Sequence, residues 1–90
     1  MNIFVLHLTP RKCAVYHANK HVVKMILESA QLLCTCWHVI DPSGDMFKPP
    51  MKRTHYNHPC AKWARESTAN YQWLAELAIC LCEEYTYRLY

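Results

Sequence analysis

The sequence predicts a mainly α fold, a small bundle of three to four helices with a short extended N-terminal segment. Glycine occurs once in the 90 residues, at Gly44, so the chain lacks the tight turns that a sandwich or barrel of short strands requires. Hydrophobic residues make up 52% of the sequence and include three Trp and six Tyr, enough large side chains to build a small core and to exclude disorder. Apolar residues also recur at helical intervals in two long stretches. A chain of this length is expected to form a single helical domain over residues 1–90.

The first part of the chain predicts an extended segment followed by a short helix. Residues 2–7 favour extended structure, and no partner strand is evident elsewhere, so they predict a short extended lead-in. Thr9 and Pro10 are typical of an N-cap and a first helical residue, and they predict a helix that runs toward His17. Asn19 is a candidate cap for the next helix.

The strongest helical pattern lies between Lys20 and about Trp37. Apolar side chains recur there at helical intervals, which places them on one face, and the polar residues between them form another face. The predicted buried stripe consists of Val22, Val23, Ile26, Ala30, Leu33 and Trp37.

A loop and two further helices are predicted after this stretch. Residues 41–53 form the loop, because they include residues that favour turns or lack an amide donor, namely Pro42, Ser43, Gly44, Pro49 and Pro50. The segment Asn57-His58-Pro59 is typical of a helix start and predicts a short helix near residues 61–66. A longer helix is predicted over residues 68–88, with a buried stripe of Leu74, Leu77, Ala78, Leu81 and Tyr85.

The charge and cysteine content predict a soluble intracellular protein with a modest basic bias. Ten Lys and Arg stand against seven Asp and Glu, and six His can add positive charge, which suits a nucleic-acid partner without demanding one. Six cysteines are present, but the N-terminus lacks the features of a secretory signal peptide, so we expect free thiols and no secretion. No apolar run reaches the roughly 20 residues needed to cross a bilayer, and no membrane partner is expected.

Four polar residues spaced by four, three and four form the first candidate site. They are His17, His21, Lys24 and Glu28, an interval that places side chains along one face of a helix. Two imidazoles beside an amine can transfer protons and favour the uncharged, nucleophilic form of the amine. We therefore predict Lys24 at the functional centre, approached by His58, with Glu28 as a general base. The alternative is an ordinary solvated helix face.

The second candidate site is the run THYNHPC over residues 54–60. We predict that it contacts DNA, because it is dense in hydrogen-bonding groups and is flanked by basic residues that can bind phosphates. The predicted nucleic-acid-binding residues are Lys52, Arg53, His55, Asn57, Lys62 and Arg65, with Lys48 extending the positive potential. Tyr56 or Trp63 could stack on an exposed base. The structural alternative is that Asn57 caps a helix, His58 is simply exposed and Trp63 fills the core.

Metal binding is a further alternative, although we predict no cofactor. His17 and His21 could share a zinc ion if they lie one helical turn apart, with His55, His58 or Cys60 completing the ligands. This arrangement matches no standard zinc signature.

The sequence resembles an uncharacterised family encoded by phages and large DNA viruses. Three runs carry the resemblance, and they span nearly the whole chain: CAVYHANKHVVKMILESAQLL, THYNHPCAKWARESTANYQWL and CEEYTYR. Members of that family extend beyond the length of this chain, which leaves open that it is the N-terminal part of a longer protein. More remotely, the order of features is similar to the pyrimidine-dimer DNA glycosylases of the phage endonuclease V type. The shared features are a short lead-in, an early helix with a polar stripe beginning at His17, the Asn57-His58-Pro59 turn, and a long helix ending in Glu and Arg.

The resemblance implies a compact helical protein that flips a base and cuts DNA beside thymine dimers. In the glycosylases an N-terminal α-amine forms a Schiff base with the sugar, and a carboxylate on the early helix assists. Here the residue after Met1 is Asn2, a poor residue for exposing a new N-terminus, and Lys24 stands where the carboxylate is expected. Glu28, one turn further on, is the nearest acid. A lysine amine could take the place of the N-terminal one.

We therefore expect a viral DNA-binding protein, with glycosylase and abasic-site lyase activity on damaged or modified bases as the enzymatic hypothesis. The expected partner is double-stranded DNA, a homodimer is left open, and the expected location is the cytoplasm of the infected host cell or the virion. Two alternatives stand beside it. One is a metal-dependent, nuclease-like enzyme that uses the His and Cys side chains, and the other is a non-enzymatic adaptor that binds a protein.

Overall fold

The computed structural model describes residues 3–89 and confirms the predicted mainly α fold. Its helices are α1 (Pro10–Val15), α2 (Asn19–Ile40), α3 (Pro59–Glu66) and α4 (Thr68–Leu89). Within the described residues there are no strands, and residues 3–7 form the extended lead-in, while Asn2 lies outside the described part. None of the helices described is both long and apolar enough to cross a membrane.

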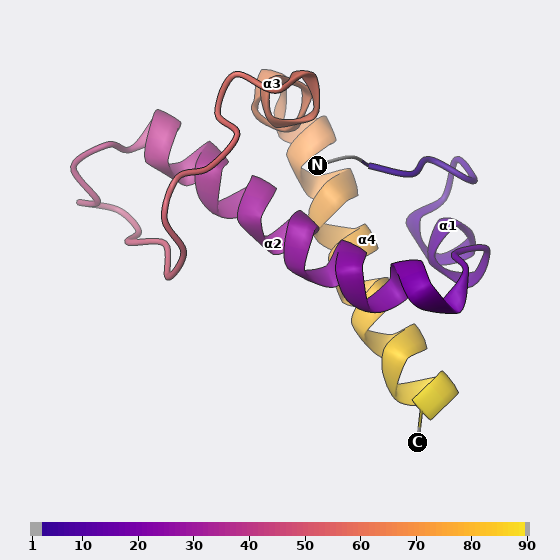
Figure 1. Cartoon of the computed structure of the whole chain (residues 1–90). Helices are drawn as coiled ribbons and strands as arrows, with labels where there is room; N and C mark the ends of the chain where they lie inside the picture. The colour runs from indigo at the N-terminus through magenta and orange to yellow at the C-terminus, as the bar shows by residue number, and fades with distance from the viewer. Residues whose placement is uncertain (1–2, 90) are drawn as a thin grey trace.

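The two long helices, α2 and α4, cross and form the centre of the molecule (Figure 1). The short helix α1 packs against α4, and α3 packs against both α2 and α4 at the other end. Their contact surfaces consist of aliphatic side chains and cysteines with a few small residues. The fully buried side chains at the centre are Leu32, Cys36, Leu74, Leu77 and Leu81. The core is thin, as expected for a chain of this size.

The buried face of α2 differs from the predicted stripe. The residues buried along the helix are Val22, Met25, Ser29, Leu32, Cys34, Thr35 and Cys36. Val22 is 2% exposed, whereas its neighbour Val23, which was predicted to be buried with it, is 53% exposed. The prediction was wrong here because apolar residues occur on several faces of α2, and periodicity alone does not select the face that α4 covers.

The helix starts follow the predicted signals, with one correction. Helix α1 begins at Pro10 after Thr9, as predicted, although the Thr9 side chain makes no capping hydrogen bond. Helix α2 is preceded by Ala18, so Asn19 is its first residue and not its cap. The Asn19 side chain serves another purpose, because its Oδ1 accepts a hydrogen bond from Nη1 of Arg88 at 3.0 Å.

The loop after α2 projects from the helices and then returns along α2 toward α3 (Figure 1). Two side chains of α2 hold the returning segment. The Thr35 hydroxyl donates to the carbonyl of Thr54 at 3.0 Å and accepts from its amide at 3.2 Å. Nε2 of His38 donates to the carbonyl of Met51 at 2.7 Å. These bonds fix the segment that leads into α3 against a buried part of α2.

The outer end of this loop is organised by Asp41, which directly follows α2. Its carboxylate accepts hydrogen bonds from the backbone amides of Met46 at 2.8 Å and Phe47 at 3.2 Å. These bonds, the Met46 bond first, lower the pKa of Asp41 below its ordinary value, and the Ser43 hydroxyl adds to the effect. A single carboxylate thereby satisfies two amides in a segment that proline keeps out of regular structure.

The six cysteines all lie within the described residues and are unpaired. Most of them are small core residues: Cys13, Cys34, Cys36 and Cys80 are buried. Burial raises the pKa of the Cys36 thiol to about 11, although the guanidinium of Arg65 acts in the opposite direction. The Cys36 thiol is therefore protonated and unreactive at neutral pH.

Candidate functional site

His17, the first residue of the predicted polar stripe, lies in the turn between α1 and α2 and is 3% exposed. Its Nδ1 donates to the carbonyl of Cys13 at 2.7 Å, since a carbonyl oxygen can only accept. Its Nε2 is buried and has no hydrogen-bond partner among the described residues. His17 is therefore not part of a solvated helix face, and only His21, Lys24 and Glu28 follow one another on α2.

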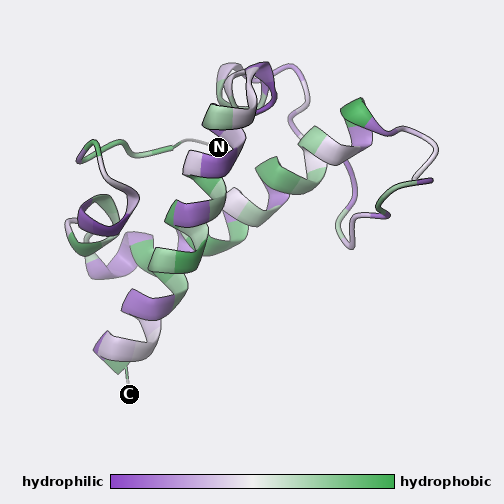
Figure 2. Ribbon diagram, turned by 180° about the vertical axis from the view of Figure 1, so that it is seen from behind, coloured by the Kyte–Doolittle hydropathy of each residue, from purple (hydrophilic) through white to green (hydrophobic). Residues whose placement is uncertain are grey.

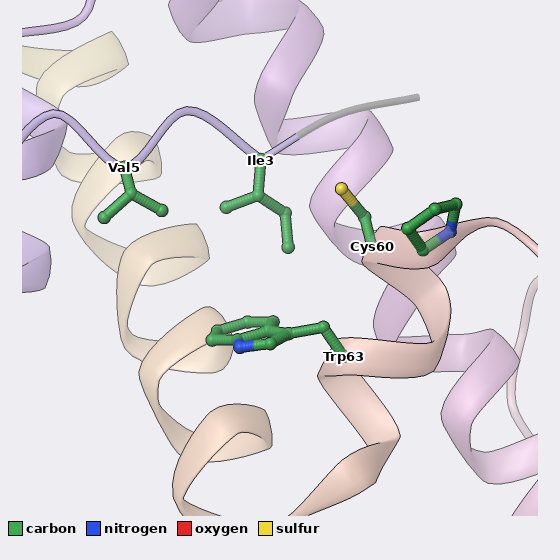
Figure 3. Close-up of a pocket in the computed structure, with 5 residues that line it drawn as sticks. Ile3, Val5, Cys60 and Trp63 are labelled. Carbon is green, nitrogen blue, oxygen red and sulfur yellow. The ribbon is translucent and has the colours of Figure 1, made fainter.

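The aromatic ring of Phe4 lies against His17 and His21, the two histidines of the first candidate site. Its centroid is 6.0 Å from that of His17 and 5.0 Å from that of His21. The extended lead-in alternates its side chains, so Ile3 and Val5 point away from Phe4. Figure 3 shows both pointing toward the indole of Trp63 on α3. The lead-in therefore lies against both regions: Phe4 contacts His17 and His21, and Ile3 and Val5 face Trp63 of α3.

A hollow of about 410 Å³ lies between the lead-in and α3. Its lining is almost entirely apolar and consists of Ile3, Val5, Pro59, Cys60 and Trp63 (Figure 3). The ring of Trp63 is supported from α4 by Trp73, which lies edge-on with the centroids 6.2 Å apart. Nε1 of Trp73 in turn donates to the carbonyl of Leu8 at 2.9 Å. The hollow therefore has one rigid aromatic wall and opens beside the turn that carries His58.

Lys24 and Glu28 occupy successive turns of α2 beyond His21. The Lys24 side chain is exposed, and Glu28 is half-buried. Their spacing places His21, Lys24 and Glu28 on the same side of the helix. Within residues 3–89 no hydrogen bond or ring contact joins Lys24 to His58, so the approach of these two side chains stays a prediction.

The Asn57-His58-Pro59 segment starts α3, as predicted, but the capping residue is the histidine. Nδ1 of His58 accepts a hydrogen bond from the amide of Cys60 at 3.1 Å. The backbone carbonyl of His58 accepts from the amide of Lys62 at 3.0 Å. Asn57 is exposed and is not the cap. Since a protonated Nδ1 cannot accept, the cap requires the neutral ring of His58.

Two arginines of the second cluster gather on one tyrosine. The guanidinium carbon of Arg53 lies 4.5 Å from the ring centroid of Tyr56, and that of Arg65 lies 5.1 Å from it. Nη1 of Arg65 also donates to the carbonyl of Tyr56 at 2.7 Å. His55, directly before Tyr56, has a positive φ of 50°, and its Nδ1 lies 2.8 Å from Oγ1 of Thr54. The exposed side chains of Lys52 and Lys62 flank this group.

The positive charge of the chain is concentrated in this region. Between Asp45 and Glu66 there is no acidic residue, and the segment contains Lys48, Lys52, Arg53, Lys62 and Arg65. The rest of the chain has five Lys and Arg against seven Asp and Glu. Figure 2 shows the segment leading into α3 as a continuous hydrophilic run, whereas the lead-in is hydrophobic. The second cluster is therefore a basic face on a molecule that is otherwise slightly acidic.

Two contributions were missed or misjudged in the sequence. Phe4 was treated only as part of the lead-in, yet it contacts both His17 and His21. Side chains of an extended segment point alternately to opposite sides, which could have indicated that Phe4 faces a different part of the protein from Ile3 and Val5. Tyr56 was considered only as a base-stacking residue, and the contacts of its ring with the guanidinium groups of Arg53 and Arg65 were missed. As for metals, over residues 3–89 no three His, Cys, Asp or Glu side chains are grouped so as to hold an ion.

The family model described as pyrimidine dimer DNA glycosylase matches residues 1–90, the whole chain. No curated protein and no solved structure matches.

Proposed function

Because the chain belongs to the pyrimidine dimer DNA glycosylase family, we propose that it binds double-stranded DNA and acts as a DNA glycosylase and abasic-site lyase on damaged or modified bases. The observation that carries the proposal is the family match over the whole chain. The basic face around the start of α3 supports it, because phosphate contacts supply most of the affinity of such proteins for DNA. The resemblance to phage and large-DNA-virus proteins supports a role during viral infection.

The basic face is proposed as the surface that contacts the DNA backbone. Arginine and lysine side chains bind phosphate oxygens and set the position of the protein on the duplex. The proposed contacts come from Lys52, Arg53, His55, Asn57, Lys62 and Arg65. The bonds from Thr35 and His38 hold the segment in place, so that little order has to be gained on binding.

The apolar hollow beside this face is proposed to receive a base. A glycosylase cannot reach the bond to the sugar inside a stacked duplex, so the nucleotide must be turned out of the helix. The indole of Trp63 offers a flat surface on which a base can stack. The volume of the hollow, about 410 Å³, falls in the range of small-ligand sites, about 300–1,000 Å³.

The proposed chemistry at the sugar uses an amine and a carboxylate. The amine of Lys24, in its deprotonated form, attacks C1′ of the abasic aldehyde. His21 donates a proton to the resulting hydroxyl group, which leaves as water, and a protonated Schiff base remains. The carboxylate of Glu28 then removes a proton from C2′, and the C3′–O bond breaks with the phosphate as leaving group. Lys24 and Glu28 are suited to this sequence because they lie one turn apart on the same side of α2.

The three histidines are proposed to support these steps in different ways. His21 is half-buried against Phe4, and we assign it proton transfer to or from the sugar. His17 is proposed as a positioning residue, because its ring lies behind Phe4 and is bonded to the carbonyl of Cys13. His58 caps α3 beside the hollow, and its other ring nitrogen is assigned a hydrogen bond to the nucleotide.

Trapping with borohydride tests the proposal. Wild-type protein is mixed with duplex DNA that contains one abasic site, borohydride is added, and covalent adducts are resolved on a denaturing gel. The matched variants are Lys24→Ala and Lys20→Ala, since both lysines are exposed on neighbouring turns of α2. A third sample is wild-type protein acetylated selectively at its N-terminus. We expect an adduct with wild type, with Lys20→Ala and with the acetylated protein, and none with Lys24→Ala.

Two other outcomes would contradict the proposal: one would assign the reaction to the N-terminal amine, and the other would show that no lyase reaction occurs. An adduct that survives Lys24→Ala and disappears on N-terminal acetylation would transfer the reaction to the α-amine and remove Lys24 from it. The absence of any adduct with folded wild-type protein would refute the lyase activity. Binding of the same duplex, measured in parallel, would then show whether DNA recognition stands without it.

A further inference from the structure

We propose that Arg53, Tyr56 and Arg65 form a phosphate clamp, in which the tyrosine ring holds two guanidinium groups ready to bind phosphodiester groups of a DNA strand. The inference rests on the proposed function, because its ligand is DNA. It goes further by assigning Tyr56 the role of a positioning residue that acts through the two arginines. We refer to these three residues as the clamp.

Both arginines of the clamp lie against the ring of Tyr56. Their guanidinium carbons lie 4.5 Å and 5.1 Å from the ring centroid, within the distance of about 6 Å at which the face of an aromatic ring attracts a cation. Arg65 is held a second time by its bond of 2.7 Å to the carbonyl of Tyr56. A guanidinium has five N–H donors in a planar fork, so this bond leaves others for a ligand.

The four arginines of this protein differ in their counter-charges. Arg11 pairs with Glu83 at 2.7 Å, and Arg88 pairs with Glu84 at 2.9 Å. In the part of the chain that the structure describes, no carboxylate lies within ion-pair distance of Arg53 or Arg65. Two cations on one ring repel each other, and phosphate anions bound to the guanidinium groups would weaken that repulsion. Phosphate fits this requirement, because its oxygens accept paired hydrogen bonds from arginine.

The backbone holds the tyrosine in position. His55 adopts the left-handed conformation with φ of 50°, and its carbonyl accepts a hydrogen bond from the amide of His58 at 2.9 Å. This turn places Tyr56 between the anchored Thr54 and the start of α3. Tyr56 is 39% exposed, so the clamp lies at the surface, where a DNA strand can reach it.

A double-mutant cycle in DNA binding tests the clamp. The affinity for a duplex oligonucleotide is measured by fluorescence anisotropy between about 50 and about 200 mM salt, the range over which phosphate contacts are weakened most visibly. The variants are Tyr56→Phe, Tyr56→Leu, Arg53→Gln and the double variant Tyr56→Leu with Arg53→Gln. Thermal melting confirms that each variant is folded.

The clamp predicts a specific pattern of salt slopes. Tyr56→Phe keeps the aromatic face and should bind like wild type. The slope of log K against log salt is negative, and Arg53→Gln should make it less steep by about 0.9, as expected for one lost phosphate contact. The same variant should weaken binding roughly tenfold near 0.1 M salt. Tyr56→Leu removes no charge, yet it should also weaken binding and make the dependence of log K on log salt less steep. Adding Arg53→Gln to Tyr56→Leu should then change little, because the arginine has already lost its position.

The outcomes separate the clamp from the proposed function. If wild-type protein does not bind duplex DNA, the proposed function fails. If wild type binds and Tyr56→Leu keeps its affinity and slope, the positioning role of Tyr56 is refuted while DNA binding stands. If Tyr56→Leu does not fold, Arg53→Gln decides, because an exposed arginine that contacts no phosphate would leave the slope unchanged and overturn the clamp.

Discussion

Arg88, near the end of α4, joins three segments of the chain through one side chain. Its guanidinium donates to Glu84 Oε1 at 2.9 Å and to the carbonyls of Val15 at 2.8 Å and His17 at 2.7 Å. It also donates to the side chain of Asn19 at 3.0 Å. Carbonyls at the end of a helix have no partner within that helix and take one from elsewhere. A single residue therefore holds the turn that carries His17.

Replacing Arg88 should destabilise the protein much more than replacing Arg11. Both arginines pair with a glutamate of α4, but the Arg88 side chain is 19% exposed and the Arg11 side chain is 63% exposed. We expect Arg88→Ala to lower the free energy of unfolding by about 2–3 kcal/mol, because several hydrogen bonds to a charged group are lost together. Arg11→Ala should leave the urea midpoint nearly unchanged, as is usual for exposed ion pairs. Equal midpoints for the two variants would contradict the role of Arg88.

Two adjacent valines, Val22 and Val23, lie on different faces of α2, and only one of these faces is buried in the core. Val22 belongs to the buried face with Met25 and Leu32, whereas Val23 is half-exposed beside the end of α4. Both residues have the same side chain and the same helix propensity, so the comparison isolates burial.

Val22→Ala should lower the free energy of unfolding by about 1–3 kcal/mol, the sum of lost apolar burial and the cavity left behind. Val23→Ala should change it by less than about 0.5 kcal/mol. Urea unfolding followed by circular dichroism measures both. A larger loss from Val23→Ala than from Val22→Ala would show that the other face of α2 is the buried one.

The distribution of charge is the feature that matters most at the scale of the whole molecule. The net charge of +3 is modest, yet the segment between Asp45 and Glu66 contains five basic residues and no acid. Hydrogen bonds from Thr35 and His38 hold the later part of this segment against α2, and α3, which carries Lys62 and Arg65, packs on α2 and α4. A local potential of this kind steers a polyanion more effectively than the net charge suggests.

Charge reversal at two exposed lysines tests this asymmetry. Lys62 lies on α3 within the basic face, and Lys12 lies on α1, away from that segment. We expect Lys62→Glu to weaken binding of duplex DNA strongly and to lower its salt dependence. Lys12→Glu changes the net charge by the same amount and should weaken binding far less. Equal losses would show that net charge, and not the basic face, determines binding.

Local signals in the sequence predicted the helices and their approximate ends. Pro10 and Pro59 marked helix starts, proline and glycine between α2 and α3 marked the loop, and helical periodicity marked α2 and α4. These signals are local, because a cap, a proline or an amphipathic repeat acts on residues within a few positions of itself. The basic residues around the Asn57-His58-Pro59 segment could be grouped in advance for the same reason, since they are close in the sequence.

The buried faces of the helices and the contacts between distant side chains could not be predicted from these local signals. Val22 and Val23 are equally apolar, and the crossing of α4 determined which one enters the core. His17 was expected on a polar helix face, but its ring lies against Phe4 of the lead-in. Its carbonyl accepts a hydrogen bond from Arg88, near the other end of the chain. Tyr56 meets Arg65, nine residues away, because the chain between them folds into the turn before α3 and the helix itself. Such contacts depend on how distant segments pack, and that packing is a property of the whole chain.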